Sequence, residues 1–446
     1  MSEAISIEDQ KDMATEVFAK EGYKKTKLGW IPEDWETPCI DEIFEFLSTN
    51  SFSRSLLNYK EDEGIYNIHY GDIHATFKRP LLDFNIENRI PKVNNGTPLS
   101  QNIDYLKDGD LIIADASEDY EGIGEAIELK NIGKNKVISG LHTFAFRDKN
   151  KKTAEGFRVY ILRNLLVKKA LKTIATGSKV YGISKGNIQK FRVVLPPLPE
   201  QQKIAAILST WDNAIGKQEQ LIASKKHFKK GLMQLLLTGK KRLPGFCAEW
   251  ETKTLGELCE IKGDYGINAA SVPFDPKLPT YLRITDIDED GKFKVQNKTS
   301  VNNQYSKNFY LEEEDIVFAR TGASVGKTYL HKSENGKLVF AGFLIRFRTN
   351  PNKLTPYFLR QYVNSNKYWN WVRVFSVRSG QPGINSKEYA ILPISIPPIS
   401  EQKKISIVFK MVDKEIALLQ TQLTQLQSQK RGLMQKLLTG EMRVKI

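Results

Sequence analysis

Cysteine and long apolar runs are scarce in this chain, and their scarcity argues against a disulfide-bonded, membrane or secreted protein. Three cysteines occur in 446 residues, Cys39, Cys247 and Cys259, and no two of them form a Cys-x-x-Cys pair. We therefore expect no disulfide framework, and we expect the protein to occupy a reducing compartment. No apolar stretch reaches the ~18 residues that a membrane span needs, and the acidic N-terminal segment lacks the apolar core of a secretion signal. These absences predict a soluble cytoplasmic protein with no membrane partner.

Most motifs of catalysis are also missing. The chain has no Gly-x-x-x-x-Gly-Lys-Ser/Thr phosphate loop, no Asn-Pro-Pro-Tyr or Asp-Pro-Pro-Tyr sequence and no glycine-rich cofactor loop after a strand. Its five histidines stand at no ligand spacing from the cysteines. We therefore expect no cofactor and no metal site on this chain, and any chemistry that it serves should belong to partners.

Two weak catalytic patterns do occur, each in one half of the chain only. Gly322-Ala323-Ser324-Val325-Gly326 matches the nucleophile elbow of hydrolases, but His331 follows too closely for the usual triad. Asp115 with Glu128-Leu129-Lys130 is loosely similar to the triad of a Mg²⁺-dependent nuclease. An ordinary turn and a solvated charge pair explain these patterns better, so the sequence predicts no catalytic residue.

Basic residues are in excess. Lysine plus arginine number 66 against 52 aspartates plus glutamates, a net charge of +14. Such a surplus attracts polyanions, because each neutralised phosphate releases a condensed counterion. Nucleic acid is the leading partner class, although charge alone leaves open a basic protein with no such partner.

The chain is an internal repeat. LPPLPEQQKI at 195–204 returns as IPPISEQKKI at 396–405, and GLMQLLLTG at 231–239 returns as GLMQKLLTG at 432–440, both at an offset of 201 residues. The preceding parts echo one another more faintly, as in Trp35 with Trp250 at an offset of 215 and Gly140 with Gly342 at 202. Each half is therefore predicted to be a variable module followed by a constant helix. The predicted boundaries are an extension at 1–24, module 1 at 25–198, a central helix at 199–240, module 2 at 241–399 and a C-terminal helix at 400–446.

Each constant segment begins after a Pro-Pro pair and ends at a glycine, Gly239 or Gly440. Apolar residues recur at alternating steps of four and three, the period of a coiled coil, so we expect the two helices to pack antiparallel about a pseudo-two-fold axis. Gln218, Lys225 and Lys229 interrupt the first copy. The alternative is that each helix packs only on its own module. The seam, which would also suit a partner subunit, comprises Ile204, Leu208, Trp211, Ile215, Leu232, Leu236, Ile405, Val412, Ile416, Leu419, Leu423, Leu426, Leu433 and Leu437.

The fold class is predicted as α+β, with two mixed α/β modules in tandem separated by the two long helices. Short β-branched and aromatic runs indicate strands at 111–114, 143–146, 316–319 and 344–347. One helix is expected at about 157–175, with a counterpart at about 356–374.

Glycine-containing loops with hydroxyl, amide and cationic groups are candidates for DNA contacts. Loop 115–122 is acidic whereas its counterpart 320–327 carries two cations, which predicts that the modules read different bases, the first through cytosine amino groups and the second through guanine or phosphate. For any single residue, a purely structural turn stays open. The candidates are Lys78, Arg79, Ser117, Ser178, Lys179, Tyr181, Arg320, Thr321, Ser324, Lys327, Arg378, Ser379 and Gln381.

The doubled LPPLPEQQKI signature and the paired GLMQ…LLTG helix ends resemble the specificity subunits of Type I restriction-modification systems, over nearly the whole chain from about Lys25. The resemblance implies that each module is a target recognition domain for one half of a bipartite, asymmetric site in double-stranded DNA. It further implies that the helices form a spacer and dock two methyltransferase subunits. Motor-nuclease subunits would complete the restricting enzyme, with S-adenosylmethionine, ATP and Mg²⁺ on these partners. The alternative is a non-catalytic scaffold without sequence-specific DNA binding.

Overall fold

The computed structural model describes residues 21–59, 64–119, 122–177 and 180–445. The chain divides into two compact units, residues 1–217 with 423–446 (unit 1) and residues 218–422 (unit 2). Each unit contains one module and parts of both long helices. Most of the predicted extension, residues 1–20, and the predicted DNA-contact residues Ser178 and Lys179 lie outside the described residues.

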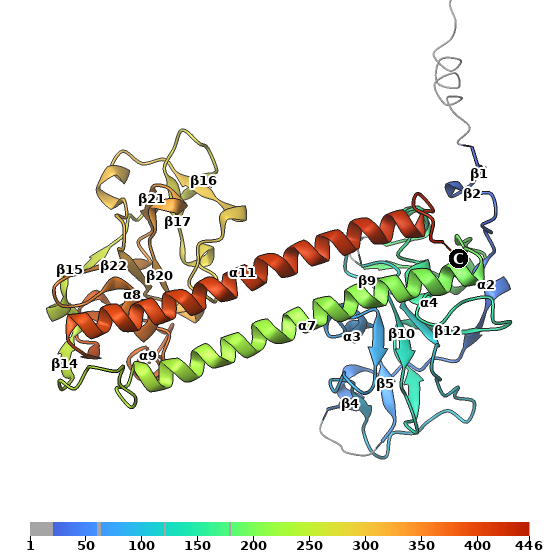
Figure 1. Cartoon of the computed structure of the whole chain (residues 1–446), viewed down its shortest axis with the longest axis horizontal. Coiled ribbons are helices and arrows are strands. Elements are labelled where there is room, and N and C mark those ends of the chain that lie inside the picture. The colour runs from blue at the N-terminus through green and yellow to red at the C-terminus, as the bar shows by residue number, and fades with distance from the viewer. Residues whose placement is uncertain (1–20, 60–63, 120–121, 178–179, 446) are drawn as a thin grey trace, which may run out of the picture. The chain divides into compact units, whose positions relative to one another are not determined.

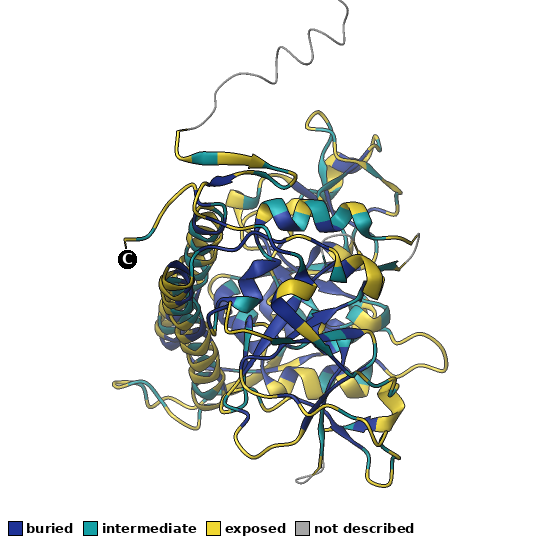
Figure 2. Cartoon of the chain, turned by 90° about the vertical axis from the view of Figure 1, so that its right-hand side faces the viewer, coloured by how far each residue is buried: buried dark blue, intermediate teal, exposed yellow. Residues whose placement is uncertain are grey.

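Module 1 contains two sheets in which the buried strands lie inside and the loops are exposed (Figure 2). The five-stranded sheet has the order β3-β12-β8-β10-β6, and the four-stranded sheet has the order β11-β5-β7-β4. The small pairs β1-β2 and β13-β9 complete it. Its strands are β1 (Tyr23–Thr26), β2 (Gly29–Pro32), β3 (Phe44–Leu47), β4 (Leu57–Asn58), β5 (Tyr66–Ile68), β6 (Leu81–Asp83), β7 (Lys92–Val93), β8 (Leu111–Ala114), β9 (Ala116–Ser117), β10 (Ala126–Lys130), β11 (Val137–Ser139), β12 (Thr143–Asp148) and β13 (Tyr181–Gly182).

Module 2 repeats this plan with a sheet of order β15-β22-β19-β20, a second of order β16-β18-β17-β21, and the pair β14-β23. All four predicted strands are present, as β8, β12, β19 and β22, and they occupy matching central places in the two modules. The strands of module 2 are β14 (Glu251–Thr254), β15 (Cys259–Tyr265), β16 (Ser271–Pro273), β17 (Thr280–Leu282), β18 (Thr299–Val301), β19 (Ile316–Ala319), β20 (Thr328–Leu330), β21 (Leu338–Phe340), β22 (Leu344–Thr349) and β23 (Pro393–Ile396).

The single helix expected near 157–175, and its counterpart near 356–374, are each two helices in the structure. Asn164 begins a new helix because its Oδ1 accepts from the backbone N–H groups of Leu166 and Val167. Ser365 begins the second helix of module 2 in the same way, because its hydroxyl oxygen accepts from the N–H of Tyr368. The prediction of one continuous helix was wrong at these capping residues. The helices of the modules are α2 (Ile40–Ile43), α3 (Tyr70–Ala75), α4 (Arg158–Ile161), α5 (Leu165–Ile174), α6 (Lys185–Gln189), α8 (Pro356–Tyr362), α9 (Asn366–Phe375) and α10 (Ser386–Ala390).

The two long helices, α7 (Leu198–Leu236) and α11 (Ile399–Leu438), pack side by side and antiparallel within each unit (Figure 1). In unit 1 the start of α7 and the end of α11 enter one hydrophobic core with module 1, through residues such as Leu208 and Leu437. In unit 2 the end of α7 and the start of α11 do so with module 2, through Leu236 and Ile405. All the predicted seam residues are buried or half-buried. The helices therefore pack both on each other and on the modules, and the predicted fold class is confirmed.

The polar residues that interrupt the seam of α7 have partners on α11. In unit 2, Nε2 of Gln218 donates to the carbonyl of Leu419 at 2.9 Å. Lys225 lies 2.7 Å from Glu415, and Lys229 lies 2.8 Å from Asp413. These contacts join the helices where apolar side chains are missing, so the seam continues through its polar part.

The start of each long helix is tied to its module by a buried glutamine. Oε1 of Gln201 accepts from the N–H of Ala154, and its Nε2 donates to the carbonyls of Lys152 and Pro196. Gln402 makes the same three bonds, to Thr355, Lys353 and Pro397. The repeated signature therefore contains a side chain that satisfies three backbone groups in each copy. None of the described helices is long and apolar enough to cross a membrane.

Candidate nucleic-acid interface

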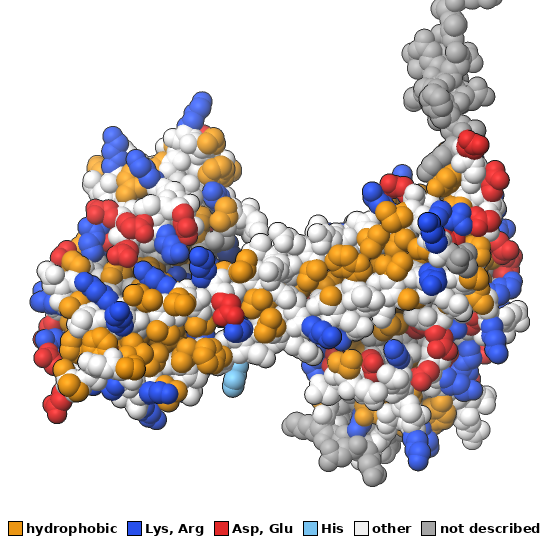
Figure 3. Space-filling model, viewed as in Figure 1, with side chains coloured by type: hydrophobic (Ala, Val, Ile, Leu, Met, Phe, Trp, Pro, Cys, Tyr) orange, Lys and Arg blue, Asp and Glu red, His pale blue; other side chains and the backbone are white. Residues whose placement is uncertain are grey.

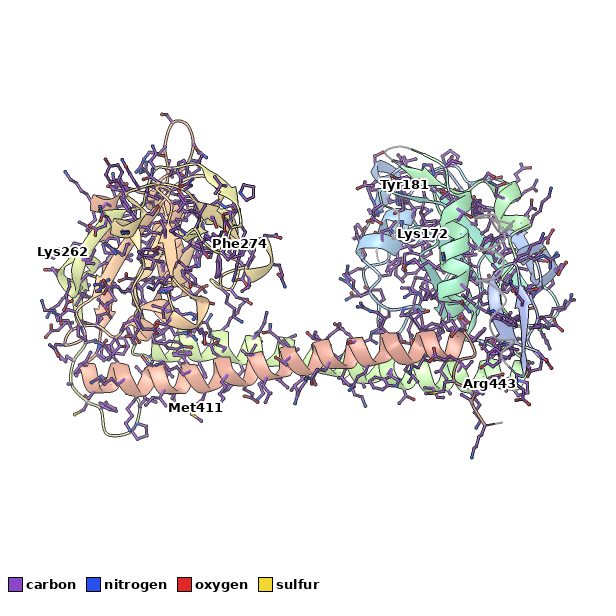
Figure 4. The ribbon with its side chains drawn as sticks, turned by 90° about the horizontal axis from the view of Figure 1, so that it is seen from above. Lys172, Tyr181, Lys262, Phe274, Met411 and Arg443 are labelled. Carbon is purple, nitrogen blue, oxygen red and sulfur yellow. The ribbon has the colours of Figure 1, made fainter. Side chains whose placement is uncertain are left out.

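The two candidate loops of module 1 meet each other. Ser117 in β9 pairs with Tyr181 in β13, and the N–H of Ile183 donates to the carbonyl of Asp115 at 2.9 Å. Ser117 is 4% exposed, and its Oγ accepts from the N–H of Asp119, so this side chain shapes the loop from inside. Tyr181 is half-buried and lies on the side of module 1 opposite α7 (Figure 4). A partner at these loops can thus approach module 1 away from the helices.

The candidate loops of module 2 meet by equivalent contacts. Thr321 forms a bridge with Gly383, and the N–H of Gly322 donates to the carbonyl of Pro382. The N–H of Ile384 donates to the carbonyl of Arg320 at 2.9 Å, as that of Ile183 does to Asp115. Each module therefore presents one joined loop pair in which most of the candidates lie, Thr321, Ser324, Ser379 and Gln381 among them.

The cations of the module 2 loops differ in how far they are neutralised. Nζ of Lys327 lies 2.5 Å from a carboxylate oxygen of Glu289. Arg378 donates to both carboxylate oxygens of Glu388 at 2.6 Å. Arg320 forms no ion pair with any described residue, and its guanidinium lies 5.0 Å from the ring centre of Tyr265. Arg320 is thus the candidate of these three that keeps its charge available to a ligand.

Lys78 and Arg79 follow helix α3, away from the loop pair in sequence. Lys78 is exposed, whereas Arg79 is half-buried against α7. A Cβ atom on Gly216 would stand 2.1 Å from a guanidinium nitrogen of Arg79. The glycine within α7 therefore makes room for this arginine, and the structure places Arg79 at the base of module 1.

Sequence reasoning did not find His142, which lies beside Asp115. Nδ1 of His142 is 3.3 Å from Oδ1 of Asp115. Burial raises the pKa of Asp115, and the neighbouring imidazole opposes that rise. The pairing joins residues 27 positions apart, so no local motif marks it. The backbone shows which residue of module 2 corresponds to His142. The N–H of Asp115 donates to the carbonyl of His142, and the N–H of Arg320 donates to that of Phe343, so Phe343 is the counterpart of His142.

Two further backbone hydrogen bonds correct one equivalence drawn from the sequence. Gly140 donates its N–H to the carbonyl of Ile68, and Ala341 donates to that of Leu282, the matching strand residue. Gly140 therefore corresponds to Ala341 and not to Gly342. The offset of 201 residues, already present along the long helices, extends back to this turn.

One side chain of each weak catalytic pattern has a structural partner. Glu128 is buried, so the prediction of a solvated charge pair was wrong for this residue; its two oxygens accept from the N–H groups of Gly156 and Val159 at the start of α4. His331 is also buried, and its Nδ1 contacts the hydroxyl of Tyr329 at 3.2 Å. Burial has the largest effect on both pKa values: it raises the pKa of Glu128 to about 7 and lowers the pKa of His331. Glu128 and His331 are thus engaged in holding their modules together.

Two modules with one framework and unlike loop pairs define a tandem recognition protein. Residues 32–224 and 248–428 each match the family model described as the Type I restriction modification DNA specificity domain. The chain belongs to this family, and it contains the domain twice.

Relatives extend over nearly the whole chain. The putative specificity subunit of the type I restriction enzyme MjaX from Methanocaldococcus jannaschii is 25% identical, with alignment over 96% of this chain and 98% of that protein. The MjaVIII specificity subunit of the same organism is 24% identical, over 96% and 97%. The crystal structure of an S subunit of a Type I restriction-modification system from M. genitalium is 14% identical and covers 91% of this chain and 96% of that one, with a TM-score of 0.53. That structure shows the same fold.

Proposed function

We propose that this chain reads a bipartite, asymmetric site in double-stranded DNA, with one half-site read by each module. The observation that carries the proposal is that the modules share their framework contacts but differ in the loop pairs. Loop 115–122 is acidic, whereas loop 320–327 carries Arg320 and Lys327. Hydrogen-bond donors and acceptors distinguish bases at their edges, so unlike loops on one framework suit two different half-sites.

The two long helices are proposed to set the number of base pairs between the half-sites. Helices α7 and α11 have 39 and 40 residues without a break. At about 1.5 Å per residue, each is roughly 60 Å long. Half-sites read from one face of the duplex lie about 34 Å apart per helical turn, so helix length suits a spacer of this scale.

The exposed faces of the helices in unit 2 are proposed to dock methyltransferase subunits. Ile407, Met411 and Leu418 are exposed on α11, and Met411 points away from module 2 (Figure 4). Hydrophobic side chains gather on the visible face of unit 2 around α11 (Figure 3). Exposed apolar patches on a charged protein are typical of interaction surfaces. On this proposal the chain has no catalytic role, and two methyltransferase subunits with the motor-nuclease subunits supply S-adenosylmethionine, ATP and Mg²⁺ chemistry.

The proposal is tested on the chain assembled with its methyltransferase subunits. Sequencing of methylated DNA from cells that carry the assembly should give one motif with two specified halves around an unspecified gap. An insertion of four residues after Leu221, in the exposed part of α7, together with one after Leu418 in α11, should change the gap and leave both halves unaltered. A motif without two halves, or altered half-sites after the insertions, would contradict the proposal.

A salt series separates this function from that of a scaffold. Binding to phosphates releases counterions, so the affinity of the assembly for duplex DNA should fall steeply as salt rises. A protein whose positive charge only aids solubility would show weak binding with no preference for the methylated motif over an unrelated duplex.

A further inference from the structure

One backbone position is shared by the two modules and carries opposite chemistry. The N–H of Asp115 donates to the carbonyl of His142 at 3.1 Å, and the N–H of Arg320 donates to that of Phe343 at 3.0 Å. The carbonyls of Asp115 and Arg320 accept from Ile183 and Ile384 respectively, both at 2.9 Å. Asp115 and Arg320 therefore stand at the same place in the frame, directly after the central strands β8 and β19.

In module 1 this position holds an acid and an imidazole. The side chain of His142 is 51% exposed, and that of Asp115 is 23% exposed. His142 has a φ of +53°, a left-handed conformation that is uncommon for residues other than glycine and tends to occur at functional positions. The ring of Tyr70 meets the imidazole edge-on at 5.2 Å between ring centres. The backbone of the loop therefore adopts an uncommon conformation at His142, with the imidazole beside the carboxylate of Asp115.

The pair lines an open hollow of module 1. The hollow has a volume of about 550 Å³, and its walls include Asp115, His142, Phe46, Phe144 and Asn50. Sites that bind small organic groups have volumes of roughly 300–1,000 Å³ and combine apolar walls with a few polar groups. The carboxylate of Asp115 therefore belongs to the wall of a hollow whose volume is in the range of sites for small organic groups.

In module 2 the same position holds a cation over the face of an aromatic ring. The guanidinium of Arg320 lies 5.0 Å from the ring centre of Tyr265, and the neighbouring Phe343 is 56% exposed. The guanidinium group is planar, and its edge can donate two parallel hydrogen bonds. Guanine offers the matching pair of acceptors, O6 and N7, in the major groove.

We propose that this shared position reads a base in each half-site: Asp115 with His142 takes a base with an exocyclic amino group, cytosine or adenine, and Arg320 takes guanine. The inference rests on the proposed function and names the residues that carry it. A phosphate contact at this position would favour a cation in both modules, since a carboxylate repels phosphate. The acid at one of two equivalent places therefore marks the position as one that reads bases and not backbone.

The test uses the assembly of the full chain with its methyltransferase subunits and duplexes changed one base pair at a time. Arg320→Gln should reduce discrimination at a single guanine of the module 2 half-site by on the order of tenfold to a hundredfold. Asp115→Ala, which removes the acceptor without supplying an amide that reads adenine, should do so at a single cytosine or adenine of the other half-site, and the base found there identifies the source of the amino group. Each variant should leave the opposite half-site unchanged.

Matched controls carry the same charge changes elsewhere. Glu36→Gln changes an exposed acid of module 1 outside the acidic loop, and Arg373→Gln changes an exposed cation of α9; neither should change any base preference. His142→Gln with Arg320→Lys keeps the test informative if a first variant fails to fold. Unchanged preference at every position, or an equal loss of affinity for all sequences, would overturn the inference while leaving a wild-type bipartite motif, and so the proposed function, intact. The absence of any sequence preference in the wild-type assembly would instead overturn the proposed function.

Discussion

In both modules a buried aspartate holds an arginine of the central sheet, Asp110 with Arg147 in module 1 and Asp315 with Arg348 in module 2. In both, an aspartate of the long helix accepts from a module tyrosine and pairs with a lysine of the other helix. Asp212 does so in unit 1 and Asp413 in unit 2. The loops that follow the central strands share backbone contacts but begin with unlike side chains, Asp115 in module 1 and Arg320 in module 2. The comparison teaches that this fold keeps its frame constant with buried hydrogen bonds, and so leaves the loop side chains free to differ.

The frame is not identical everywhere. Trp35 in module 1 donates from Nε1 to Glu200 at 2.9 Å, whereas Nε1 of Trp250 in module 2 has no hydrogen-bond partner among the described residues. Glu128 of β10 caps α4, whereas Leu330 stands at the same strand position of module 2. Substitutions at shared contacts should therefore have equal effects in the two modules, and substitutions at Trp35 or Glu128 should have effects that module 2 lacks.

The largest effect is expected where the frame is the same in both modules. Leaving one buried backbone group without a partner costs about 1–3 kcal/mol. Gln201→Leu and Gln402→Leu each leave three backbone groups without a partner, some of them only part-buried, so each should lower the free energy of unfolding of its own unit by about 3–5 kcal/mol. Hydrogen exchange resolved along the chain measures both units. The exposed neighbour, changed in Gln202→Leu, should cost almost nothing, and unequal losses in the two units would break the comparison.

A pH-dependent difference is expected at Glu128, which is 1% exposed. Burial raises its pKa from 4.5 to about 7, so the folded chain binds this proton more tightly than the unfolded chain does. Stability should therefore fall as the pH rises from 4.5 towards 7, by up to about 3 kcal/mol. Glu128→Gln should remove that part of the decline in thermal melts of unit 1, while the exposed Glu36→Gln should not. A variant profile parallel to that of the wild type would show that Glu128 titrates normally.

A smaller asymmetry is expected at the two tryptophans. A buried hydrogen bond to a charged group contributes about 1.5–3 kcal/mol. Trp35→Phe loses the bond to Glu200 as well as the packing of a buried ring, whereas Trp250→Phe loses only the packing of a half-buried ring. Trp35→Phe should therefore destabilise its unit by about 2 kcal/mol more than Trp250→Phe does. Denaturant unfolding of the two variants measures the difference, and equal losses would mean that the bond to Glu200 is replaced by another donor.

Repetition and period made much of this fold predictable. The offset of 201 residues and the alternating steps of four and three located α7, α11 and their seam, and short β-branched runs located β8, β12, β19 and β22. The break between α4 and α5 escaped because the amphipathic pattern runs through Asn164, and only the capping geometry shows that a new helix begins there.

The site was less predictable than the fold, because its contacts join distant residues. Loop composition indicated Arg320 but not its place over the ring of Tyr265, and indicated Asp115 but not His142. Arg443 pairs with Glu200 across 243 positions, and its counterpart Arg242 pairs with Glu401. The repeat shows that the arginines are equivalent. It does not show that the arginine after each long helix pairs with the glutamate at the start of the other long helix.

The smallest effect is expected at Gln218, where the two copies of the seam differ by one side chain. The position 201 residues later is Leu419, whose carbonyl accepts from Gln218. Gln218→Leu would restore the apolar repeat and gain burial, but it would lose this bond and the one to Gln422. The bond to Leu419 and the burial gained are each worth about 1 kcal/mol, and the exposed bond to Gln422 is worth less, so we expect stability to change by less than about 1 kcal/mol. Thermal melts of this variant beside Gln220→Leu, an exposed position on the same helix, measure it. A clear loss of stability would mean that the polar bonds fix the register of α7 on α11 in unit 2, and that the middle of the seam holds the helices in place by hydrogen bonding where its ends do so by packing.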